Sequence, residues 1–211
     1  MDIQSRLEST QPSDLIIETR SRFDMVVGVP HHAPAGAPRL PCPEHPDSDE
    51  NTGFIGRHLA QRLDCASVIA CNATIDPNKH DDSGYTRQIV AWQPAILIEI
   101  HGHGKVRSSY DVEISCGSVE QTSRSEDLAE AVNRHLSTDP QLADVSVCGR
   151  FIDLYFRATK TLTITDSRWL AYHIELSSRL RKPPSGLAGL PTAPALRFCE
   201  HLADSLLEKH G

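Results

Sequence analysis

The chain has 211 residues, 39% of them apolar, which is enough for one globular domain with a sizeable core. A formal net charge of −7 without a basic cluster argues against nucleic acid or an anionic membrane as the main partner. The sequence has neither a signal-like leader nor a run of the roughly 20 apolar residues that span a membrane. Six scattered cysteines without a C-x-x-C pair indicate reduced thiols, and we expect a cytoplasmic protein.

The first half of the chain alternates short apolar runs with helical patterns. Residues 1–21 are polar, and we expect at most a loosely held N-terminal arm there. The predicted elements that follow are a buried strand at 24–30, a helix that opens at 49–51, a strand at 67–71, a helix at 85–91 and a strand at 95–101. The loop at 33–48 is too long for an ordinary connection, which is typical of functional or disordered loops.

The second half continues the alternation and ends in an amphipathic helix. Its predicted elements are strands at 110–115, 145–147, 152–156 and 172–176, and helices at 125–136 and about 195–209, with a Pro/Gly-rich connector at 182–194. Alternating strands and helices predict a single α/β domain over 1–211, with a mainly parallel mixed sheet and helices on both faces.

Histidines and carboxylates gather where ligands bind in such sheets, beyond the carboxyl ends of the strands. The candidates are His31 or His32, Asp49 or Glu50, and His101 or His103. A catalytic zinc commonly takes two histidines and a carboxylate and keeps one position for water. Glu99 shares a strand face with His101 and could hold a histidine ring from behind. Taken singly, each histidine would more often be a hydrogen-bonded structural residue.

Five segments resemble, in order, the N-formylglutamate amidohydrolase family. They are VPHHAP at 29–34, ENTG at 50–53, DPNK at 76–79, EIHGHG at 99–104 and YHIELSSRLR at 172–181. That family carries P-H-x-G, D-x-N-R and D-x-H-S segments and a late Q-x-E followed by an arginine. It belongs to the fold group of zinc carboxypeptidases and aspartoacylases, and in the aspartoacylases the glutamate ligand also stands in an E-x-T-G helix start. Each motif is weak alone, but five in the right order are more specific.

The resemblance implies a zinc carboxypeptidase-like fold and a zinc-dependent amidohydrolase. Carried over by position, the zinc ligands are His31, Glu50 and His101, and the general base is Glu175. His103 is then expected to donate a hydrogen bond in the pocket or to the transition state, because a catalytic zinc must keep a position open.

The implied substrate is a small N-acyl amino acid, an amide that carries a carboxylate. We expect it to bind near Asn78 and Lys79, with Arg107 and Asn72 as further candidates. The sequence departs from the family here, because Lys79 replaces the arginine of D-x-N-R and Asn72 replaces an earlier arginine.

Other readings of the sequence stay open. The loss of two family arginines favours either a binding protein that has lost turnover or a hydrolase repurposed for an ester or a peptide. Glu175 could form a structural ion pair with Arg179, and Lys79 could be a solvated residue beside Asp81 and Asp82. No nucleophile motif for serine or cysteine catalysis is recognisable in the sequence.

Overall fold

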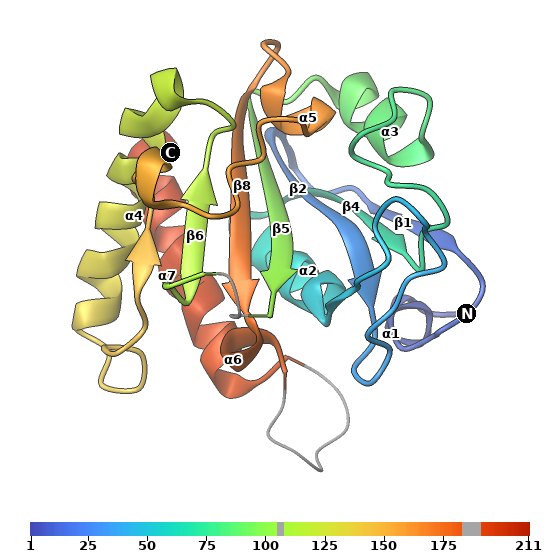
Figure 1. The fold of residues 1–211 in the computed structure, drawn as a ribbon, viewed down its shortest axis with the longest axis horizontal. Coiled ribbons are helices and arrows are strands. Elements are labelled where there is room, and N and C mark those ends of the chain that lie inside the picture. Colours follow the sequence, from blue (N-terminus) through green and yellow to red (C-terminus); the bar gives the residue numbers. More distant parts are fainter. Residues whose placement is uncertain (105–107, 183–190) are drawn as a thin grey trace.

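The computed structural model describes residues 1–104, 108–182 and 191–211, which contain a single mixed sheet of eight strands (Figure 1). The strands follow the order β1-β4-β2-β5-β8-β6-β7, and β3 pairs with β2 at the end of that strand. Their bounds are β1 Asp14–Glu18, β2 Arg22–Ala33, β3 Asp49–Glu50, β4 Cys65–Cys71, β5 Ile96–His103, β6 Val112–Ser115, β7 Val147–Cys148 and β8 Leu170–Ser177. The predicted fold class is confirmed.

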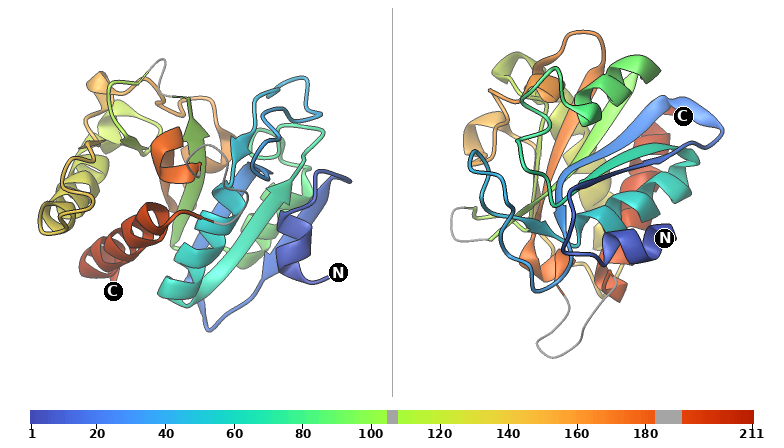
Figure 2. Two further views of the ribbon diagram at one scale, coloured as in Figure 1. Left: turned by 90° about the horizontal axis from the view of Figure 1, so that it is seen from below. Right: turned by 90° about the vertical axis from the view of Figure 1, so that its right-hand side faces the viewer.

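Helices cover both faces of the sheet. Their bounds are α1 Ile3–Leu7, α2 Thr52–Leu63, α3 Gly84–Trp92, α4 Thr122–Ser137, α5 Leu162–Thr165, α6 Ser178–Arg181 and α7 Ala193–His210, with short 3-10 turns at Val119–Gln121 and Phe151–Asp153. Figure 2 shows α7 beside α2 and α4 on one face, and these helices are in contact. None of the helices that the structure describes is long and apolar enough to cross a membrane.

The central strands are buried on both faces, as their continuous apolar runs predict. In β5, Ile98 and Ile100 join the apolar cluster under α2, α4 and α7, whereas Leu97 joins the cluster under α3 and α5. This alternation fixes which side chains share a face, because successive residues of a strand point to opposite sides. Parallel pairing of β2, β5 and β8 brings their carboxyl ends to one edge, where His101 lies opposite Glu175.

Three sequence predictions are wrong. The helix expected to open at 49–51 begins at Thr52, and Asp49 and Glu50 form β3 instead. The expected N-terminal arm instead holds α1 and β1, because β1 pairs antiparallel with β4 and Arg6 binds Asp14 at 2.6 Å. The strand predicted at 152–156 is a 3-10 turn followed by a loop. The Phe156 N–H there donates to the carboxylate of Glu113 at 2.8 Å and not to a neighbouring strand.

Gly56 tests how closely α2 packs on the sheet. A Cβ at this position would lie 2.3 Å from Cγ2 of Val29. We expect Gly56→Ala to lower the free energy of unfolding, since overpacking costs about 1–3 kcal/mol and better helix propensity returns about 1 kcal/mol. Urea unfolding measures the change. In a Val29→Ala background the clash is absent, so the same substitution should be neutral or stabilising; an equal loss in both backgrounds would contradict this packing.

Candidate metal centre

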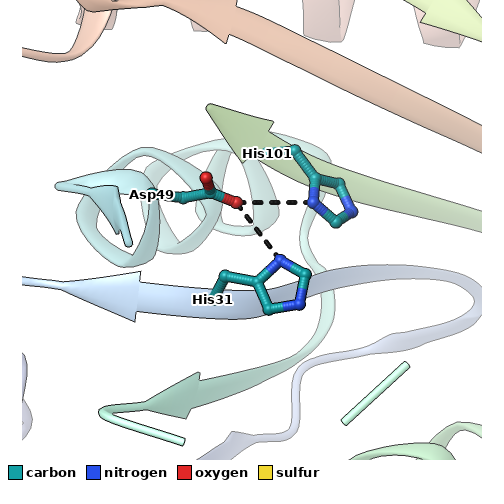
Figure 3. A group of neighbouring side chains, drawn as sticks. All are labelled: His31, Asp49 and His101. Carbon is teal, nitrogen blue, oxygen red and sulfur yellow. Dashed lines mark ion pairs between the residues drawn. The ribbon is translucent and has the colours of Figure 1, made fainter. Parts of the chain in front are cut away.

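Three buried side chains from different strands meet at the carboxyl edge of the sheet (Figure 3). Oδ2 of Asp49 lies 3.4 Å from Nδ1 of His31 and 3.4 Å from Nδ1 of His101. Zinc bonds of about 2.0–2.1 Å in tetrahedral geometry separate neighbouring ligand atoms by roughly 3.3–3.4 Å. The spacing therefore suits two edges of a zinc coordination sphere.

The lack of hydrogen bonds at these atoms supports the same conclusion. Oδ2 of Asp49 and Nδ1 of His31 lie within ion-pair distance of each other, but neither makes a hydrogen bond to any residue that the structure describes. Both side chains are buried, and burying a polar atom without a hydrogen bond is costly. A cation bound between Asp49 and the two imidazoles would satisfy these atoms, so the residues present fit a zinc ion.

A second carboxylate lies behind each imidazole. Nε2 of His31 lies 3.0 Å from Oδ1 of Asp76, and Nε2 of His101 lies 3.3 Å from Oε2 of Glu99. Metal-binding histidines usually give their second ring nitrogen to a carboxylate or carbonyl, which fixes the ring and its tautomer. With both Nε2 atoms engaged in this way, the two Nδ1 atoms are the ones directed at the metal position.

The supporting carboxylates are themselves held by several donors. Glu99 is fully buried and accepts hydrogen bonds from Tyr85 at 2.8 Å, Thr163 at 2.7 Å and Asn78 at 3.1 Å. Asp76 accepts a hydrogen bond from Nζ of Lys79 at 2.6 Å. Asn78 and Lys79 therefore act on the carboxylates behind the histidines.

The net charge of the cluster depends on whether its imidazoles and carboxylates are protonated. Burial opposes the charged imidazole, but the carboxylates of Asp49 and Glu99 outweigh it and raise the pKa of His101 to about 10. Burial likewise opposes the charged form of Asp49, yet the two histidines hold its pKa well below the usual range. Without a cation the cluster keeps protons on its imidazoles. Metal binding must then displace protons, so the affinity should fall as pH falls.

His32 has a structural role. Its Nδ1 accepts a hydrogen bond from the Gly53 N–H at 3.0 Å, and its Nε2 lies 3.0 Å from the carbonyl of Leu7. Burial lowers the pKa of His32 to about 4. Of the two adjacent histidines, the structure thus brings His31 to the cluster.

Glu50 does not reach the two histidines, although the resemblance placed the carboxylate ligand there. Its carboxylate accepts the Gly36 N–H at 2.9 Å and binds Nζ of Lys182. Asp49 and Glu50 form the short strand β3 and not the opening of a helix, so their side chains point in opposite directions. The structure therefore corrects the position: Asp49 is the carboxylate that joins His31 and His101.

A hollow of about 450 Å³ opens over this edge, and Glu175 lies in its wall. Burial raises the pKa of Glu175 to about 8. Arg179 does not pair with it, because the guanidinium binds Asp144 at 2.5 Å instead. His103 also lines the hollow, and its ring lies 5.4 Å from that of Phe156.

The predicted substrate residues that the structure describes, Asn72, Asn78 and Lys79, are not on the walls of this hollow. Asn78 and Lys79 lie behind the histidines, and Asn72 donates to the carbonyl of Ser9 at 2.9 Å. Arg107 lies outside the described residues. A larger hollow of about 580 Å³ opens near Ala95 and Leu170, at the opposite end of the strands, and contains none of the metal-site residues.

Sequence reasoning missed two residues that face the hollow. The ring of His45, from the loop at 33–48, stacks on that of His31 at 3.7 Å with an interplanar angle of 8°. The length of the loop was its only signal. Arg181 is 2% exposed and donates to the carbonyls of Leu176, Glu50 and His103 at 2.9, 2.8 and 3.2 Å. It ties together β3, β5 and β8, which carry Asp49, His101 and Glu175.

Comparison with known proteins gives fold relatives only. No family model and no curated protein matches the sequence. A bacteriophage poly-gamma-glutamate hydrolase matches with a TM-score of 0.61 at 14% identity, covering 94% of this chain and 90% of that one. The zinc-free form of YNDL matches at 0.58 and 14%, covering 98% and 95%. An N-formylglutamate amidohydrolase from Ralstonia eutropha JMP134 matches at 0.51 and 14%, covering 92% and 96%. The family that the motifs resemble is thus represented among the structures that share this fold.

Asp76 offers a test of the outer carboxylates. We expect Asp76→Asn to weaken zinc binding by about 10–100-fold, the usual cost of losing such a partner, while the protein stays folded. Competition with a chromophoric chelator measures the affinity. Lys79→Met is the matched control, because it removes the other partner of Asp76 and leaves the contact with His31. Equal affinities in wild type and Asp76→Asn would rule out a supporting role for Asp76.

Gly102 tests the contacts of Arg181. A Cβ at this position would lie 2.2 Å from Cζ of Arg181, whereas a Cβ at Gly104 would have no atom within 4 Å. We expect Gly102→Ala to displace the guanidinium, lowering both the melting temperature and the zinc affinity. Gly104→Ala should change neither. If the two variants behave alike in thermal melts and zinc titrations, Arg181 does not hold the site together.

Proposed function

We propose that the protein is a zinc-dependent amidohydrolase that cleaves the amide of a small N-acyl amino acid. One observation carries the proposal: two imidazole nitrogens and a carboxylate oxygen converge at metal-ligand spacing beside the buried carboxylate of Glu175. His31, Asp49 and His101 would hold the ion. Zinc bound there supplies a Lewis acid for the scissile carbonyl and lowers the pKa of its water to about 7.

Glu175 is proposed as the general base. It takes a proton from the attacking water and delivers it to the leaving amine. Its burial supports this role, because a carboxylate with a raised pKa accepts a proton more readily than an exposed one. The rate should therefore rise with pH as Glu175 loses its proton. The pH range of this rise follows the raised pKa of Glu175, and a nearby cation would lower that pKa and move the range to lower pH.

The walls of the hollow supply donors for the substrate. His103 and His45 are proposed to donate hydrogen bonds to the oxygen that develops negative charge. Lys182 is proposed to meet the substrate carboxylate in place of Lys79, since its side chain is 41% exposed at the hollow and is already placed by Glu50.

A repurposed hydrolase is the second candidate. The family arginines are absent at Asn72 and Lys79, and neither residue faces the hollow, which supports a changed mode of substrate recognition. An ester or a peptide is the alternative substrate. Metal analysis of the purified protein, followed by a screen of N-acyl amino acids, their methyl esters and short peptides, tests the proposal. Stoichiometric zinc with no turnover on any of them would leave only a binding function.

Glu175→Gln should keep its zinc and its fold but lose about 10²–10⁴-fold in turnover, the usual contribution of a general base. The amide has the same shape and cannot accept the proton. Steady-state kinetics with elemental analysis on the same preparation measure both quantities. Arg179→Gln is the control, because Arg179 binds Asp144 and not Glu175. Near-normal turnover in Glu175→Gln would exclude it as the base.

Lys182→Met should raise KM for a substrate with a free carboxylate more than for its methyl ester, since only the free acid loses an ionic contact. Lys79→Met should affect both substrates alike, because its Nζ is held by Asp76. Kinetics on the matched pair give the comparison. If Lys79→Met instead raises KM for the free acid selectively, Lys79 binds the substrate carboxylate. If Lys182→Met affects the free acid and the methyl ester equally, Lys182 does not bind that carboxylate.

A further inference from the structure

We propose that the centre offers a divalent cation a second, alternative position, held by His101, His173 and Glu175. The inference rests on the proposed function through two shared residues, His101 as metal ligand and Glu175 as base. It adds His173, which lies in the YHIELSSRLR segment but is neither a ligand carried over from the family nor a member of the first ligand set.

The geometry of β5 and β8 places the three side chains together. His101 lies opposite Glu175 in the parallel pair, and His173 precedes Glu175 by two residues on the same face. One ligand atom from each lies within 4.8 Å of the other two. Nε2 of His173 and Oε1 of Glu175 are 3.5 Å apart, close to the roughly 3.3–3.4 Å edge of a tetrahedral zinc site.

Both added residues are buried, each 6% exposed, and each keeps a polar atom without a hydrogen bond to any described residue. These atoms are Nδ1 of His173 and Oε2 of Glu175, the second nitrogen and second oxygen of the pair just measured, so neither group is committed to another partner through them. The rings of His173 and His101 lie 4.2 Å apart, so the second group directly adjoins the first.

The shared histidine makes the two positions exclusive. Nε2 of His101 is held by Glu99, so Nδ1 is the nitrogen that either position can use. One lone pair binds one ion, and the centre therefore holds one cation at a time. An ion bound to one oxygen of Glu175 lowers the affinity of that carboxylate for a proton and so weakens it as a base. The second position is therefore expected to be a less active state of the proposed enzyme.

Cobalt(II) binding to metal-free protein tests the proposal without any measurement of turnover. Wild type and His173→Gln should each bind one ion per chain at the first position. His31→Ala should still bind one ion, more weakly than wild type by more than the roughly 10–100-fold that loss of an outer carboxylate costs. His31→Ala combined with His173→Gln should bind none.

Two results would overturn the proposal. One is a folded His31→Ala protein that binds no cobalt. The other is residual binding in His31→Ala that persists when His173 is also replaced. Thermal melts establish folding, and Asp49→Ala takes the place of His31→Ala if the latter unfolds. A wild type without hydrolase activity that shows the expected binding pattern would refute the proposed function and leave the second position standing.

Discussion

The centre is governed by the burial of three carboxylates around two imidazoles. Taking a carboxylate out of water costs several kcal/mol unless charges and hydrogen bonds compensate it. Glu99 is compensated by three neutral donors besides His101, and Asp76 by Lys79 besides His31. Among the described residues, the cations within ion-pair distance of Asp49 are the two imidazoles alone. The charge balance of the whole edge therefore depends on whether protons or a cation lie beside Asp49.

The surrounding structure positions that one carboxylate. Asp49 lies in a two-residue strand that pairs with the end of β2, and the Asn51 N–H donates to the carbonyl of Ala33 at 2.8 Å. The side chain of Asn51, whose φ of 67° is in the left-handed region, donates to the carbonyl of Arg181 at 2.8 Å. These contacts fix the segment between β2 and α2, so the ligand is held by backbone pairing as well as by its partners.

Much of the fold was predictable, because its signals are local. Apolar runs located β2, β4, β5 and β8, and the rule for parallel sheets located the site at their carboxyl ends. Strand ends and alternation gave the pairs His31 or His32 and His101 or His103, together with Glu99, and only the family resemblance selected His31 and His101. The hydrolytic activity was inferred from the order of the five family-like segments, and it remains a proposal.

The rest depended on contacts between distant residues. The choice between Asp49 and Glu50 depends on β3 being a strand, and two residues carry no periodicity that would predict one. Arg181 reaches the Glu50 carbonyl across 131 residues of sequence, and His45 reaches His31 only through the course of its loop. The N-terminal strand DLIIE is a short apolar run within a polar stretch, and its pairing with β4 joins it to the sheet. The partners in these contacts are far apart in the sequence, so local composition does not identify them.

The contacts of Arg181 bear on how this site can evolve. All three acceptors are main-chain carbonyls, at Leu176, Glu50 and His103, and a main-chain oxygen is present whatever side chain the residue carries. Glu50 and His103 also line the hollow, but the hydrogen bonds from Arg181 go to their main-chain carbonyls and not to their side chains. Substitutions at these two positions can change which substrates the hollow binds without removing the hydrogen bonds from Arg181 to the main chain. In Glu50 and His103, the main-chain oxygens hold the strands together through Arg181, while the side chains are available to determine which substrates bind. The residues that line the hollow can therefore change in evolution while these main-chain contacts stay the same.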